Sequence, residues 1–130
     1  MKTLDQLHKD FGAFYPTGHM VVAFQAVMDA EKVLRELKTQ GWQAADAMEL
    51  LPQQMLDFAK KNLHEAGILA NLGSSLTTVQ SFLDAARSGA TFLILATPDD
   101  ASAERVTAAI HHVPFVLAER YHRLAIETVV

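Results

Sequence analysis

Two short stretches without a polar side chain decide the fold of this chain, Met20-Val21-Val22-Ala23-Phe24 and Phe92-Leu93-Ile94-Leu95-Ala96. Both contain β-branched and aromatic residues, which are typical of buried strands. Successive side chains of a strand point to opposite faces of the sheet. Each stretch therefore places apolar side chains on both faces, and both faces of the sheet need cover from water.

The rest of the chain shows helical periodicity interrupted by weaker strands. Ala30, Val33, Leu34 and Leu37 recur at the spacing of one helix face, and Gly41 ends that helix. A weak strand is predicted at residues 47–51, followed by a helix beginning at Pro52 and a helix that ends near Gly89 and carries Leu76, Val79, Leu83 and Ala86. Asp99 caps a further helix, which ends at Pro114 and has Ala103, Val106, Ile110 and Val113 on its inner face. Two last strands are predicted at residues 115–120 and 124–129.

The order of these elements predicts an α+β fold. It contains the split βαβ unit twice, which a ferredoxin-like antiparallel sheet satisfies, with two inserted helices and an extra C-terminal strand. In that topology the first and third strands are central and antiparallel, and the weaker second and fourth lie at the edges. We expect one α+β domain over residues 19–130, preceded by an amphipathic N-terminal arm at residues 1–18.

A ferredoxin-like sheet usually carries helices on one face only. The second apolar face is then covered either by the inserted helices or by another copy of the chain. We expect the inserted helices to share the face that is already occupied, because they lie within a single crossover. This predicts a homo-oligomer, since an exposed apolar patch of that size is unusual on a monomer.

Composition excludes several functional classes. The 130 residues suffice for one domain, and 15 acidic against 11 basic side chains give a formal charge of −4, which disfavours a nucleic-acid surface. RNA binding through the sheet is set aside because the strand at residues 92–96 offers only Phe92 and no basic residue. The absence of cysteine excludes disulfides and fits a reducing compartment. With no apolar stretch near the ~20 residues that span a bilayer, we expect a cytoplasmic protein without membrane contact.

Common catalytic and cofactor motifs are absent: there is no GxGxxG, GxxxxGK[ST], HExxH or GxSxG. His111 and His112 are adjacent on a predicted helix, so their side chains diverge by about 100° and do not share a metal. They complement the negative end of the helix instead. We therefore predict no cofactor, no metal and no catalytic residue.

The topology nevertheless predicts one cluster of polar and aromatic side chains. Antiparallel pairing brings the start of the first strand and the end of the fourth to one end of the sheet, near the end of the first helix and the turn after the third strand. A base, carboxylates, an aromatic wall and a guanidinium suit a small anionic or aromatic ligand. The alternative is that Arg123 pairs with Asp99 or Asp100 and the aromatic residues cap the core. The predicted neighbours are His19, Trp42, Asp99, Asp100, Tyr121, His122 and Arg123.

Three segments carry a family resemblance: HMVVAFQAVMDAEKVLRELKTQGW, GATFLILATPDDASAERV and ERYHRLAIETVV. Together they resemble the bacterial general stress protein domain family over residues 19–130, most distinctively at Pro98-Asp99-Asp100, Arg120-Tyr121 and Arg123-Leu124. The resemblance implies a small α+β stress-associated domain with no assigned catalytic residues. Relatives often carry a glycine-rich middle stretch, where this chain has only Gly67 and Gly73.

Two functional interpretations follow. The first is a non-enzymatic oligomeric module that senses a small ligand or binds a partner protein in a bacterial stress setting. The alternative, by analogy with dimeric α+β barrel enzymes, is a small enzyme without a bound cofactor that uses His19, Tyr121 and His122 in a pocket of histidine, tyrosine and arginine. A closed pocket containing a histidine favours the enzyme, and a solid apolar interface favours the module.

Overall fold

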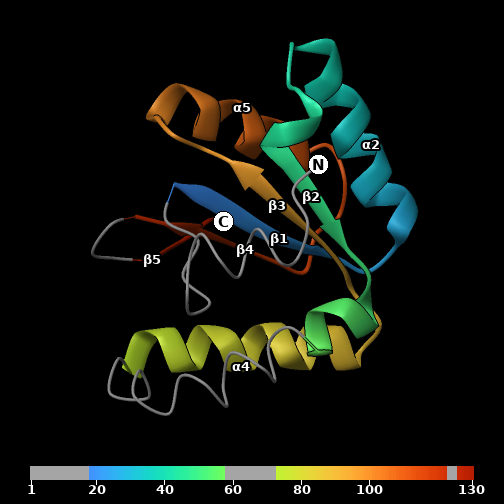
Figure 1. The fold of residues 1–130 in the computed structure, drawn as a ribbon, viewed down its shortest axis with the longest axis vertical. Helices are drawn as coiled ribbons and strands as arrows, with labels where there is room; N and C mark the ends of the chain where they lie inside the picture. The colour runs from blue at the N-terminus through green and yellow to red at the C-terminus, as the bar shows by residue number, and fades with distance from the viewer. Residues whose placement is uncertain (1–17, 58–72, 123–125) are drawn as a thin grey trace.

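The computed structural model describes residues 18–57, 73–122 and 126–130 as an α+β fold around a five-stranded antiparallel sheet (Figure 1). The N-terminal arm, apart from Gly18, and most of the predicted helix after Pro52 lie outside these residues. The elements are β1 (His19–Phe24), α2 (Val27–Thr39), the 3-10 turn η1 (Ala44–Asp46), β2 (Ala47–Leu50), a helical segment at residues 52–57, α4 (Gly73–Arg87), β3 (Thr91–Ala96), α5 (Asp100–Ile110), β4 (Leu117–Tyr121) and β5 (Ile126–Thr128).

The strand order is β2-β3-β1-β4-β5, with every neighbouring pair antiparallel. The prediction that the first and third strands are central and antiparallel is confirmed, because β1 pairs with β3 from His19 opposite Ala96 to Phe24 opposite Thr91. The prediction that the fourth strand lies at an edge is wrong. Hydrogen bonds from β5 cover the outer side of β4, so β5 forms that edge.

Side chains of β1 alternate between two hydrophobic cores on opposite faces of the sheet. Met20, Val22 and Phe24 belong to one core, and Val21 and Ala23 belong to the other. All five are fully buried. The expectation that both faces of β1 are apolar and need cover is therefore confirmed.

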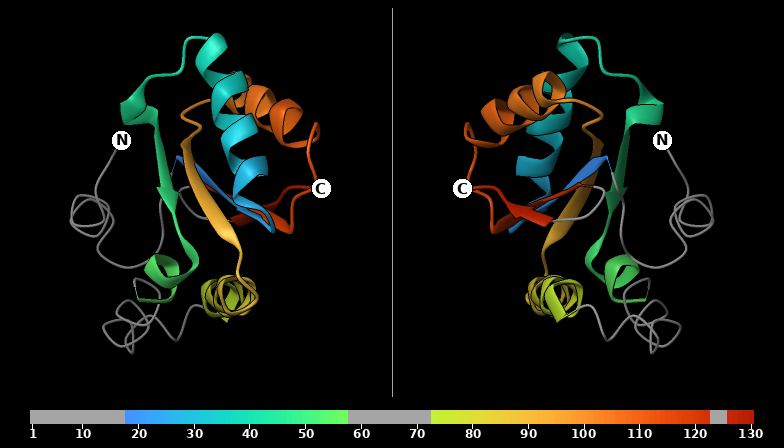
Figure 2. Two further views of the ribbon diagram at one scale, coloured as in Figure 1. Left: turned by 90° about the vertical axis from the view of Figure 1, so that its right-hand side faces the viewer. Right: turned by 90° about the vertical axis from the view of Figure 1, so that its left-hand side faces the viewer.

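The first core, here named the α2/α5 core, lies between the sheet and helices α2 and α5. Both helices run on the same side of the sheet (Figure 2), and each turns its small or branched apolar residues inward. The core consists of Met20, Val22, Phe24, Ala30, Val33, Leu37, Ala47, Leu93, Leu95, Ala103, Val106, Ala109, Ile110 and Ala118.

The second core, here named the α4 core, lies on the opposite face and is covered by α4, which the two views of Figure 2 place across the sheet from α2 and α5. The rings of Phe82 on α4 and Phe92 on β3 meet edge to face, with centroids 5.9 Å apart at 77°. The core consists of Val21, Ala23, Met48, Leu50, Met55, Phe82, Leu83, Ala85, Ala86, Ala90, Phe92, Ile94 and Tyr121.

The position of α4 corrects one step of the sequence argument. We expected the inserted helices to share the face of the other helices, but α4 covers the second face within the same chain. The apolar character of β1 and β3 therefore no longer requires a second copy. A homo-oligomer stays a prediction, but an uncovered second face of the sheet no longer supports it.

Helix α5 begins as predicted and ends earlier than predicted. The carboxylate of Asp99 accepts a hydrogen bond from the backbone N–H of Ser102 at 2.7 Å and caps the helix. That bond and a second one with the Ser102 side chain lower the pKa of Asp99. The helix ends at Ile110, not at Pro114, because Val113 N–H bonds the Ile110 carbonyl in a tighter i, i+3 turn.

We predict that Phe82→Ala lowers the free energy of unfolding by about 3–5 kcal/mol, because it leaves a cavity in the α4 core. Arg87→Ala, on the same helix but 56% exposed, is expected to change it by less than about 0.5 kcal/mol. Urea denaturation of both variants measures the difference. Equal effects would contradict the packing of α4 on the sheet.

Candidate functional site

Five of the seven predicted site residues lie at one end of the sheet. His19 is directly opposite Tyr121 in the β1–β4 pair, and His122 follows Tyr121. Gly18 donates a backbone hydrogen bond to the Tyr121 carbonyl and accepts one from Thr97 N–H, each at 2.8 Å. Asp99 and Asp100 follow two and three residues later, as the topology predicts. Arg123 lies outside the described residues.

The sheet itself separates the members of this group. Tyr121 belongs to the α4 core and is only 1% exposed. Its neighbour Arg120 points to the other face, where its guanidinium Nη1 lies 3.0 Å from Oδ1 of Asp100. On the β4–β5 hairpin, Nε2 of His122 lies 2.9 Å from Oε1 of Glu127. A single ligand therefore does not contact both Tyr121 and Asp100 in this arrangement.

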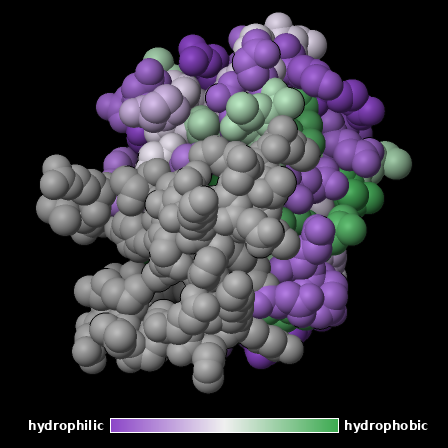
Figure 3. All heavy atoms as spheres, viewed as in Figure 1, coloured by the Kyte–Doolittle hydropathy of each residue, from purple (hydrophilic) through white to green (hydrophobic). Residues whose placement is uncertain are grey.

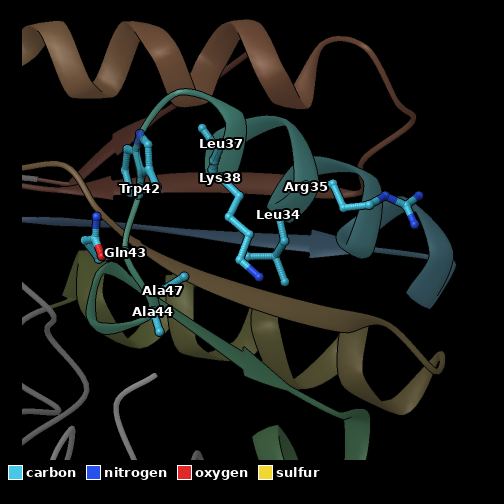
Figure 4. A pocket seen from close by; sticks show the side chains of 8 residues that line it. All are labelled: Leu34, Arg35, Leu37, Lys38, Trp42, Gln43, Ala44 and Ala47. Atoms are coloured by element: carbon cyan, nitrogen blue, oxygen red, sulfur yellow. The ribbon is translucent and has the colours of Figure 1, made fainter.

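Trp42 lines a separate hollow between the second half of α2 and the start of β2. This cavity has a volume of about 280 Å³ (Figure 4). Figure 3 shows hydrophobic surface, in light green, in the upper part of the molecule between the purple, hydrophilic surfaces of the helices. We name the cavity the Trp42 pocket. Its lining residues are Leu34, Arg35, Leu37, Lys38, Trp42, Gln43, Ala44 and Ala47.

The end of α2 determines where Trp42 lies. Gly41 has φ +94°, and its N–H bonds the Lys38 carbonyl at 3.1 Å, while Trp42 N–H bonds the Leu37 carbonyl at 3.1 Å. This pair of bonds is a Schellman motif, which brings the residue after the glycine back against the last helical turn. Trp42 is accordingly packed, partly buried, against the α2/α5 core that contains Leu37.

Reciprocal hydrogen bonds in the η1 turn hold the opposite wall of the Trp42 pocket. The backbone N–H of Gln43 donates to Oδ2 of Asp46 at 2.9 Å, and the Gln43 side chain amide donates to the Gly41 carbonyl at 3.3 Å. The first of these bonds belongs to the capping box between Gln43 and Asp46 that starts η1 immediately before β2. Ala44 and Ala47 are thereby placed at the wall with no side chain large enough to fill the space.

The two cations at the Trp42 pocket differ in direction. Figure 4 shows the Lys38 side chain extending beside Leu34 across the space that Trp42 closes on the other side. The guanidinium of Arg35 points away from the other lining residues. Lys38 alone therefore offers its charge to a molecule in the pocket.

A second, larger hollow of about 630 Å³ lies between α5 and the C-terminal strands. Both basic side chains in its lining already have protein partners, because Arg120 pairs with Asp100 and Nε2 of His111 lies 3.0 Å from the Val130 carbonyl oxygen. The neighbouring His112 instead contacts Glu36 on α2, with Nδ1 2.7 Å from Oε1. The predicted divergence of His111 and His112 is confirmed.

Sequence reasoning missed one partly buried acid on the α4 face. Glu119 lies opposite Val21 in the sheet, and burial raises the pKa of its carboxyl group. The Thr128 hydroxyl donates to both carboxylate oxygens, at 3.2 and 3.0 Å. Alternation along β4, which puts Glu119 on the same face as Tyr121, is the sequence pattern that predicts this placement.

Comparison with protein-family models, curated proteins and solved structures finds no match for this chain. The bacterial general stress protein resemblance therefore stays a prediction. Within the described ranges, no helix is long and apolar enough to cross a membrane. In the same part of the chain, no three metal-ligating side chains come together.

We predict that Gly41→Ala destabilises the protein by about 1–2 kcal/mol, because a side chain is strained at this positive φ. A Cβ added there meets nothing within 4 Å, so the cost arises in the backbone. The melting temperature should fall by roughly 2–8 °C. Gly41→Asn should lose less stability than Gly41→Ala, because asparagine tolerates the left-handed region better than alanine. Equal losses in both variants would contradict the backbone explanation.

Stability should also depend on the protonation of Glu119. Its raised pKa means that the folded state binds more protons than the unfolded state between the two pKa values, so stability falls as pH rises through that window. In thermal melts between about pH 4 and pH 8, the melting temperature should fall less steeply with rising pH for Glu119→Gln than for the natural chain. The exposed Glu104→Gln serves as the charge-matched control. An unchanged slope in Glu119→Gln would contradict the assignment.

Proposed function

We propose that this protein is a non-enzymatic module that binds a small ligand in the Trp42 pocket. The observation that carries the proposal is an apolar hollow bounded by an indole ring and held open by two separate hydrogen-bonded turns. Small-molecule sites are concave, mostly apolar and largely preformed, with a few polar groups that set orientation. A volume of about 280 Å³ lies just below the roughly 300–1,000 Å³ that is usual for such sites, which fits a ligand of one or two rings.

The enzyme alternative has weaker support. The observation that most favours an enzyme is Glu119. Its pKa is raised, and its side chain lies on the same face of the sheet as His19 and Tyr121. Catalysis requires that the reacting groups reach a substrate together. Tyr121 is buried at 1% exposure, and His122 is held by Glu127 on the hairpin. Binding without turnover is therefore the function that we propose.

We further propose that the sheet is ferredoxin-like. The order β2-β3-β1-β4 supports this, because β1-α2-β2 and β3-α5-β4 each connect strands that flank one other strand, as a split βαβ unit does. The resemblance to bacterial general stress proteins supports a stress-associated, cytoplasmic role. The proposed module is a homo-oligomer. Sedimentation at micromolar concentration tests this last point, and a monomer would contradict it.

Trp42 is the single tryptophan of the chain and therefore reports on its own pocket. We predict that a panel of one- and two-ring aromatic compounds includes ligands that saturate a change in tryptophan fluorescence. Trp42→Ala should weaken their binding at least tenfold in ligand-observed NMR, because the stacking surface is lost.

The control for this experiment is Val116→Ala. Val116 is an exposed apolar residue beside Ala23, at the other end of β1 from the Trp42 pocket. Its replacement should leave binding unchanged. Equal binding to the natural chain and to Trp42→Ala would contradict the proposed function, as would a panel without any saturating ligand.

A further inference from the structure

The geometry of the Trp42 pocket points to a planar aromatic anion as its ligand, and we propose that Lys38 receives the anionic group. This inference rests on the proposed function and names the class of ligand. It combines an aromatic wall, an apolar floor and one cation directed across the opening.

Lys38 has no carboxylate partner among the described residues, and the acids near it are engaged elsewhere. Glu36, two residues earlier on α2, contacts His112 at 2.7 Å. Asp46 accepts the Gln43 backbone N–H in the η1 turn. The Lys38 ammonium group beside the apolar pocket then has only water as a hydrogen-bonding partner, until a ligand brings an anionic group.

The position of Lys38 is set by the same motif that places Trp42. The Lys38 carbonyl accepts the Gly41 N–H, and the Leu37 carbonyl accepts the Trp42 N–H. The two side chains therefore leave adjacent ends of one rigid turn, and Figure 4 shows them on opposite sides of the opening. A flat ring against the indole places a carboxylate at its edge within reach of the flexible lysine.

The apolar lining and the small volume define the rest of the ligand. Leu34, Leu37, Ala44 and Ala47 provide no hydrogen-bonding side chain, and the amide nitrogen of Gln43 already donates to the Gly41 carbonyl. A polyhydroxylated compound would therefore lose most of its water contacts without replacement. A nucleotide would bring a ribose whose hydroxyl groups find no hydrogen-bonding partner on these four side chains. An aromatic monocarboxylate fits both limits.

The test compares naphthalene-2-carboxylate with its neutral isostere naphthalene-2-carboxamide by titration of the full chain. We predict that the carboxylate binds about fivefold more tightly, and that the advantage decreases with salt. Lys38→Met should abolish the advantage. Arg35→Met removes the same charge from the same helix but from a side chain that points away, so it should retain the advantage.

The outcomes separate this inference from the proposed function. Equal affinity of the two compounds for the natural chain would overturn the anion assignment while leaving ligand binding in place. If Lys38→Met and Arg35→Met reduced the affinity advantage of the carboxylate equally, the advantage would be a general charge effect. That result would also overturn the role of Lys38. If neither compound nor any other aromatic changes Trp42 fluorescence, the proposed function itself fails.

Discussion

Burial of both faces of β1 and β3 is the constraint on which the rest of this structure depends. These strands alternate apolar side chains toward the α2/α5 core and the α4 core, so neither face tolerates water. The chain meets this requirement with its own helices, two on one face and α4 on the other (Figure 1). At about 25 cal/mol per Å² of buried apolar surface, covering the second face is a major contribution to stability.

The strands and the helix starts at Pro52 and Asp99 were predictable because they depend on local patterns. Continuous apolar runs marked β1 and β3, and Asp99 marked the start of α5. The face that α4 covers was not predictable, because a crossover of given length reaches either side of a sheet and only packing decides between them. The end of α5 was missed for a similar reason, since Pro114 limits a helix without requiring it to extend that far.

The candidate site was predicted from the end of the sheet at which its residues lie. The structure shows that the face of the sheet on which each side chain lies is equally important for which residues come together. Arg120 and Tyr121 are adjacent in sequence yet belong to opposite faces. Strand alternation contains this information, and it separates Tyr121 from Asp100. The position of Trp42 follows from Gly41, which the sequence identified only as the end of a helix. The pocket that results depends on a Schellman motif and a capping box, both of which are local.

Isotope-filtered NMR on an equal mixture of labelled and unlabelled chains tests the central claim most directly, namely that the second face is covered by α4 of the same chain. Nuclear Overhauser contacts between the rings of Phe82 and Phe92, whose centroids lie 5.9 Å apart, should be entirely intramolecular. Intermolecular contacts between these two rings would contradict the account, because they would mean that another copy supplies the helix.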